Sequence, residues 1–205
     1  MIVELLRKRG SVRRFQEQAI PEEVLSEILE AGRLSPSGGN EQPWRFGVIT
    51  DRALIAEIAG AAYGQQWIAG APLLIVLCTT IVGDERGGRD IQIQRYPQWA
   101  ERMAGLDHGL YARLNEEEHQ TKIAGAHMAL AGLEHGVGST WVSRFDVERV
   151  AELLATPEDC IPGEILVFGY PAQPPTPHRK KDLAEVVFCN RFELSAPLSS
   201  GQAAE

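Results

Sequence analysis

The sequence predicts one domain of the α+β class, and three observations support this prediction. The chain has 205 residues, which is enough for one domain with a substantial hydrophobic core and few for two. Hydrophobic residues make up 44% and charged residues 23%, as in an ordinary globular protein. Segments with helical apolar spacing also alternate with short apolar runs of strand length. We assign residues 1–194 to this domain and expect residues 195–205 to form a disordered tail.

The helices are predicted from apolar spacing and from residues typical of helix ends. Residues 20–34 carry an apolar stripe at helical spacing, with Pro21 in the first turn. A long helix is expected over residues 116–136, and its middle is rich in Ala and Gly. Such small side chains let another backbone approach closely, either inside the core or across a dimer interface. Asp146 is a suitable N-cap for a further helix over residues 147–155.

Short apolar segments predict the strands. Residues 72–80 are nearly all apolar, which is typical of a strand that is buried on both faces. The other expected strands are residues 45–50, 139–145, 163–170 and 184–190. Residues 81–118 have no regular pattern over most of their length, and we assign them to a variable insertion or lid.

Composition argues against several classes of function. The net charge of −8 disfavours non-specific binding to nucleic acids. The longest apolar stretch, residues 71–78, is too short to span a membrane, and the first 15 residues lack the pattern of a secretory signal. Three widely spaced cysteines without a CxxC motif indicate reduced thiols and a cytoplasmic location.

Motifs for catalysis by protein side chains or by a metal ion are not found in the sequence. It contains no nucleophile elbow and no zinc-binding HExxH motif. His119, His127 and His135 are spaced eight apart on the predicted long helix, so the rise of that helix keeps them from sharing one metal ion. We therefore expect no metal site and look for an organic cofactor.

Two segments have features that suit such a cofactor. Residues 7–14 contain five basic residues and Ser11, and arginine guanidinium groups match the geometry of phosphate. Residues 35–40 are short and uncharged, so they can lie against a flat, neutral ring system. A phosphate end and a flat end together fit flavin mononucleotide (FMN), a cofactor that supplies the redox chemistry itself.

Four blocks, in this order, resemble the nitroreductase superfamily of FMN-dependent oxidoreductases. The blocks are "RGSVRRF" at 9–15, "SPSGGNEQPWRF" at 35–46, "STWV" at 139–142, and "FGYP" at 168–171 with "HRKKDLAEVV" at 178–187. They extend over most of the chain. The resemblance implies a central, mostly antiparallel sheet flanked by helices, in an intertwined homodimer with FMN at the interface.

The resemblance also assigns the residues that would bind FMN. Those expected at the phosphate and ribityl chain are Arg9, Gly10, Ser11, Arg13, Arg179 and Lys180. Those expected at the flavin ring, from a loop of the other subunit, are Pro36, Ser37, Gly38, Asn40 and Gln42. Those expected along the ring from the same subunit are Thr140, Trp141, Val142 and Ser143, with Gln65 at the pyrimidine edge.

The implied reaction is a ping-pong transfer of electrons. NADH or NADPH would reduce the flavin and leave, and a nitroaromatic, a quinone or a similar small molecule would then be reduced at the same face. No side chain is expected to act as a catalytic acid or base. The substrate pocket would include Tyr96, Trp99, Tyr111 and Arg144. The alternative is a non-catalytic flavin-binding or sensor module, in which Arg144 and the insertion block access of the nicotinamide.

Several of these residues also have a purely structural interpretation. Ser37 and Asn40 are common in local turns. Trp141 is equally consistent with strand packing, and Trp44 is favoured as a core residue. Near the C-terminus, two arginines of the family pattern correspond to the 178 and 180 positions, which here are His and Lys with Arg179 between them. The choice of phosphate ligand among these three residues is therefore left open.

Overall fold

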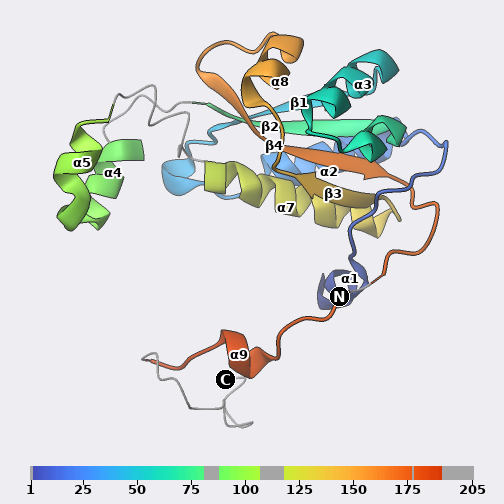
Figure 1. Ribbon diagram of the computed structural model, residues 1–205. Coiled ribbons are helices and arrows are strands. Elements are labelled where there is room, and N and C mark those ends of the chain that lie inside the picture. Colours follow the sequence, from blue (N-terminus) through green and yellow to red (C-terminus); the bar gives the residue numbers. More distant parts are fainter. Residues whose placement is uncertain (1, 81–87, 107–117, 177, 191–205) are drawn as a thin grey trace.

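The computed structural model describes residues 2–80, 88–106, 118–176 and 178–190 (Figure 1). A four-stranded sheet with the order β1-β2-β4-β3 lies at its centre. The strands are β1 (Trp44–Ile49), β2 (Leu73–Thr80), β3 (Gly138–Val142) and β4 (Cys160–Gly169). All neighbouring strands are antiparallel, so the predicted α+β class with a mostly antiparallel sheet is confirmed.

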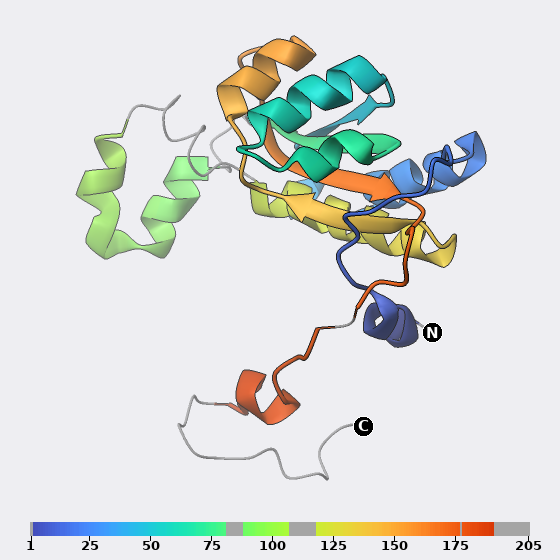
Figure 2. The ribbon, with the colours of Figure 1, turned by 45° about the vertical axis from the view of Figure 1, so that its right-hand side comes forward.

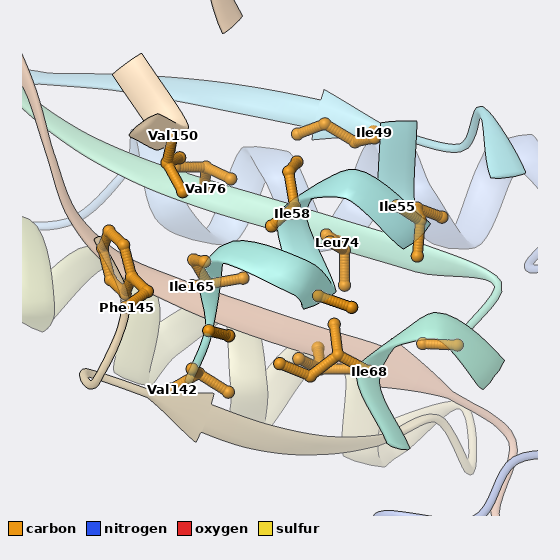
Figure 3. Close-up of a cluster of buried hydrophobic side chains, with 14 of the residues drawn as sticks. Ile49, Ile55, Ile58, Ile68, Leu74, Val76, Val142, Phe145, Val150 and Ile165 are labelled. Carbon is orange, nitrogen blue, oxygen red and sulfur yellow. The ribbon is translucent and has the colours of Figure 1, made fainter. Parts of the chain in front are cut away.

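Helices cover both faces of the sheet (Figures 1 and 2). On one face lie α2 (Glu22–Arg33) and α7 (Glu118–Glu134). On the other lie α3 (Arg52–Ala61), the 3₁₀ helix η2 (Gln66–Gly70) and α8 (Val147–Leu154). Figure 3 shows the core of this second face, where Ile55, Ile58 and Ile68 lie against the sheet.

The central strand β2 is buried on both faces, as predicted from its apolar run. Leu74 and Val76 face the α3 side, whereas Leu73, Ile75 and Leu77 face the α2 and α7 side. All five side chains are at most 1% exposed. Because strand side chains alternate between faces, an apolar residue at every position requires two covered faces.

The small residues of α7 allow close packing inside the core. A Cβ added at Gly125 would lie 2.5 Å from Leu77 Cδ1 and 2.8 Å from Trp141 Cη2. A Cβ added at Gly132 would lie 3.3 Å from Phe168 Cε1. These small residues were expected to allow close approach either inside the core or across a dimer interface, and the contacts at both glycines agree with packing inside the core.

Two expectations about local structure are wrong. Residues 184–190 were expected to form a strand, but the chain forms α9 (Leu183–Val186), which Asp182 and Glu185 stabilise through a capping box. Residues 81–118 were expected to be irregular over most of their length, but the described part of this segment forms α4 (Gly88–Arg95), η3 (Pro97–Trp99) and α5 (Ala100–Ala104). These helices are too short to produce a repeated apolar period in the sequence.

Two helices lie toward the ends of the chain. The first is α1 (Ile2–Lys8), and Figure 1 shows the C-terminal segment leaving the sheet and leading to α9. The tail expected at residues 195–205 lies outside the described residues. Among the helices that are described, none has both the length and the apolarity needed to cross a membrane.

Candidate cofactor site

The N-terminal basic segment lies along the free edge of β3. Ser11 forms a parallel bridge with Ser139, and the backbone N–H of Val12 donates to the carbonyl oxygen of Ser139 over 3.3 Å. The Thr140 hydroxyl donates to the carbonyl oxygen of Val12 over 2.6 Å. These three contacts join "RGSVRRF" to "STWV", two blocks that lie about 128 residues apart in the chain.

The segment after β4 lies against the same N-terminal residues. The backbone N–H of Gln16 donates to the Tyr170 carbonyl, and that of Ala172 donates to the Arg14 carbonyl. A Cβ added at Gly10 would lie 2.8 Å from Pro175 Cβ, so only glycine fits where these two segments meet. The fold therefore fixes the N-terminal block between β3 and the segment that leads to the C-terminal basic residues.

Arg7 in the N-terminal segment pairs with Glu4, but the cations expected at the phosphate are not neutralised within the described part of the chain. No carboxylate there forms an ion pair with the basic residues expected at the phosphate, which are Arg9, Arg13, Arg179 and Lys180. The guanidinium carbon of Arg13 lies 5.6 Å from the ring centroid of Trp67. In a chain with an excess of acidic residues, unpaired cations are available to an external anion.

The β3 residues expected along the flavin ring offer backbone rather than side chains. Thr140 and Val142 are both 1% exposed, and the half-buried Trp141 packs on the α7 side of the sheet. The Ser139 carbonyl points to the outer edge, where it meets Val12. Since antiparallel strands alternate their hydrogen-bonding directions, the backbone groups of Trp141 and Ser143 point to that same edge.

Two consecutive residues of the turn that follows β3, Ser143 and Arg144, are held by side chains from other segments. The Ser143 hydroxyl donates to Glu164 Oε1 over 2.6 Å, and Lys122 Nζ lies 3.3 Å from the other oxygen of that carboxylate. Glu164 is only 2% exposed. Gln65 Nε2 donates to the carbonyl oxygen of Arg144 over 3.0 Å and to that of Ala62 over 3.1 Å. The amide N–H₂ of Gln65, expected at the pyrimidine edge, thus contacts the turn.

Sequence reasoning missed Glu164 and Lys122. A single acidic residue in the apolar run "GEILVFG" is a signal that could have marked Glu164, because a buried charge requires a partner. Lys122 carries no comparable signal, since a lysine near the start of a helix is ordinary.

The loop before β1 is fixed by its own turns and by α7. The backbone N–H of Gly38, in the 3₁₀ helix η1 (Gly38–Asn40), donates to Gln120 Oε1 over 2.6 Å. The Ser37 hydroxyl accepts from the backbone N–H of Gln42, so this hydroxyl makes a local turn. Pro36 and Gly38 are exposed at the loop surface.

The backbone of this loop has positive φ angles at three residues, of which the two that are not glycine are strained. Gly39, Asn40 and Gln42 have φ angles of +56°, +59° and +52°. The left-handed region costs a residue other than glycine about 1–2 kcal/mol, and such strain is concentrated at functional sites. Among the described residues, no hydrogen bond of the exposed Asn40 side-chain amide is present. That amide is therefore available to a ligand.

The two predicted contact regions lie at opposite edges of the sheet. The loop with Asn40 leads into β1, whereas Arg13 and Ser11 lie beside β3. Three strand spacings separate these edges, about 14 Å. The first turn of α7 lies between the regions: Gln120 contacts the loop, and two residues later Lys122 contacts Glu164 beneath the β3 turn.

Two of the predicted pocket residues of the insertion lie at a short 3₁₀ helix: Trp99 is the last residue of η3, and Tyr96 directly precedes that helix. Tyr96 and Trp99 are 43% and 47% exposed, and each ring lies beneath a neighbouring arginine, Arg95 or Arg102. Figure 1 shows α4 and α5 to one side of the sheet. Tyr111 lies outside the described residues.

The thiols near the sheet are unsuited to nucleophilic chemistry. Burial raises the pKa of Cys78 to about 12, and the neighbouring Cys160 adds to the rise. Burial also raises the pKa of Cys160. Since the thiolate is the reactive form, neither cysteine is reactive at neutral pH.

Comparison with known proteins identifies the family. The sequence model of the nitroreductase family matches residues 6–170. The chain is 33% identical over 188 residues to the NADH dehydrogenase of Thermus thermophilus, with 88% of this chain and 91% of that relative covered.

Solved structures share the fold. The crystal structure of a nitroreductase family protein from Clostridium difficile has a TM-score of 0.70 and 27% identity, over 93% of this chain and 98% of that chain. An FMN-dependent nitroreductase from the same species also has a TM-score of 0.70, at 21% identity, over 93% and 99% of the two chains. The resemblance inferred from the four sequence blocks is thus confirmed: the chain belongs to the nitroreductase family.

Proposed function

We propose that this protein binds FMN beside β3 and uses it to transfer electrons from NADH or NADPH to a small acceptor such as a nitroaromatic or a quinone. One observation carries the proposal: the unpaired Arg9 and Arg13 belong to the segment that pairs with β3 at Ser139, and among the described residues the same strand edge has no backbone partner at Trp141 and Ser143. A phosphate requires the first feature, and the polar edge of a flavin ring is matched by the second.

The residues present fit FMN. Arg9, Arg13 and the Ser11 hydroxyl would hold the phosphate, together with Arg179 and Lys180 from the C-terminal segment. The backbone at Ser143 would face the ring, and Glu164 and Gln65 keep that turn in place. Bound FMN would supply the redox chemistry by accepting two electrons from NAD(P)H and passing them to the second substrate.

We further propose that the site is completed by a second copy of the chain. The strained loop with its available Asn40 amide lies at the opposite edge of the sheet from the basic cluster of its own subunit, and the separation of the two edges alone is about 14 Å. The C-terminal segment also exposes apolar side chains, with Leu183 68%, Val186 60% and Phe188 57% exposed. A homodimer would cover these side chains and bring the loop of one subunit to the basic cluster of the other. Light scattering measures the oligomeric state of the protein, and a monomer at micromolar concentration would contradict this arrangement.

A cytoplasmic location fits the thiols. All three cysteines are free, including the exposed Cys189, as expected in a reducing compartment. The alternative of a sensor without nicotinamide access predicts flavin binding without NAD(P)H oxidation.

The test is a visible absorption spectrum of the purified protein, followed by mass analysis of the molecule that heat releases. We expect a yellow protein that releases FMN and oxidises NADH or NADPH when a quinone is added. Parallel lines in double-reciprocal plots would support ping-pong transfer. A yellow protein that oxidises neither nucleotide would favour the sensor, and a colourless protein that fails to take up FMN would contradict both.

A further inference from the structure

Arg144 is presented beside the β3 turn in a fixed position. It directly follows Ser143, and its carbonyl oxygen accepts a hydrogen bond from Gln65. Its guanidinium carbon lies 5.7 Å from the ring centroid of Tyr63. The backbone and the side chain of this exposed residue are therefore both held by residues 63–65, which connect α3 to η2.

The charge of Arg144 has no counterpart in the described part of the chain. The carboxylates near it in sequence or space have other partners: Asp146 accepts from the Arg149 N–H as a helix cap, and Glu164 binds Ser143 and Lys122. By contrast Arg149, only five residues later, pairs with Glu152 over 3.0 Å and approaches Glu57 to 3.8 Å. The cation at 144 is thus left for a partner from outside.

Tyr63 provides an unusual platform for this cation. Its φ angle is +48°, that of the following Gly64 is +84°, and its side chain is 58% exposed. A tyrosine in the left-handed region is uncommon and carries a cost in conformational energy. In this backbone conformation the Tyr63 ring lies at the surface under the Arg144 guanidinium, and the cation–π contact fixes the plane of that guanidinium. The N–H groups of a guanidinium held in this way can bind a carboxylate with two hydrogen bonds.

We propose that Arg144 and Tyr63 form a subsite that selects aromatic electron acceptors bearing a carboxylate or sulfonate group. The proposal rests on the proposed function, since it is the flavin beside Ser143 that would place the electron acceptor next to this turn. The guanidinium binds the anionic group of the acceptor, and the Tyr63 ring borders its aromatic part. The subsite differs from the phosphate cluster, because Ser139, where that cluster meets β3, is four residues from Ser143, about 13 Å along a strand.

The experiment compares 4-nitrobenzoate with its neutral methyl ester as electron acceptors of the FMN-loaded protein. We expect Arg144→Gln to raise the KM for 4-nitrobenzoate by roughly tenfold or more, the size expected for loss of a charge-assisted hydrogen bond. The KM for the ester should change by less than about twofold, and Arg144→Lys should restore part of the difference. Arg149→Gln is the matched control, because its cation is already paired, and it should leave both KM values unchanged.

Binding gives a second readout that does not depend on turnover. Benzoate, which is not reduced, is titrated into the oxidised holoprotein while the flavin absorbance is followed. Wild type should bind benzoate in a salt-sensitive manner, and Arg144→Gln should weaken this binding to the same degree as it raises the KM. Equal use of acid and ester by wild type, or an Arg144→Gln variant with unchanged KM and benzoate binding, would overturn the subsite while the reductase function stands. A wild-type protein that neither binds FMN nor reduces any acceptor would overturn the proposed function, and the subsite with it.

Discussion

The contact between β3 and the N-terminal segment can be tested with one added methyl group. In Gly138→Ala the new Cβ would lie 2.4 Å from Val12 Cγ2, 3.1 Å from Val12 Cβ and 3.3 Å from Pro171 Cγ. Ordinary carbon contacts begin near 3.4 Å, so Val12 has to retreat by about 1 Å. Rotating its side chain does not suffice, because its Cβ is also too close.

The backbone at Val12 must therefore move, and two hydrogen bonds resist this movement. They are the bond from the Val12 N–H to Ser139 and the bond from the Thr140 hydroxyl to the Val12 carbonyl. Overpacking of a core site costs about 1–3 kcal/mol, and weakening a hydrogen bond costs about 1 kcal/mol. We expect Gly138→Ala to lower the free energy of unfolding by roughly 2–3 kcal/mol. For a chain of this size that corresponds to a fall in Tm of about 4–12 °C.

Thermal unfolding of the purified variants measures this effect, and two controls sharpen it. Gly60→Ala, in α3, adds a Cβ that meets nothing within 4 Å, so it should raise stability slightly. In the double variant Val12→Ala/Gly138→Ala the clashing Cγ2 is gone, and the combined loss should be smaller than the sum of the single losses. A Gly138→Ala variant whose Tm stays within about 1 °C of wild type would refute the packing of this segment against β3.

Three further predictions concern the site and the core. Arg13→Ala should weaken FMN binding by about tenfold or more, as measured by fluorescence titration, whereas Arg14→Ala should have little effect; equal effects would indicate a diffuse basic patch. Asn40→Ala should shift the absorption spectrum or reduction potential of bound FMN, and an unchanged spectrum and potential would favour a role in the turn alone. Burial raises the pKa of Cys78 from 9.0 to about 12, so the folded state keeps this proton between pH 9 and 12 while the unfolded state loses it. The free energy of unfolding should therefore fall as the pH rises through this range. Urea unfolding between pH 9 and 10.5 should show that the free energy of unfolding falls less steeply with pH in Cys78→Ala than in wild type. An equal dependence on pH in the two proteins would contradict the raised pKa of Cys78.

Residue types in short blocks were sufficient to propose a candidate site. Arginines with an intervening serine indicate a phosphate, and a run of short neutral residues indicates a flat ligand, because both inferences depend on local chemistry. The sequence could not indicate how individual side chains would be used. Thr140 was expected at the flavin ring, but its hydroxyl bonds to Val12, and Ser37 bonds within its own loop. Gln65 was expected at the ring edge, and its amide holds the β3 turn.

The sequence by itself determined the class of the fold and most of its elements. A continuous apolar run specified β2 as a doubly buried strand, and the Asp146 cap marked the start of α8, because both signals are complete within a few residues. Only the tertiary structure decided the strand order β1-β2-β4-β3 and the pairing of Ser11 with Ser139. It alone placed Glu164 between Ser143 and Lys122. The physical reason is that each of these contacts joins residues distant in sequence, and a residue's type records that it needs a partner without recording which segment will supply it.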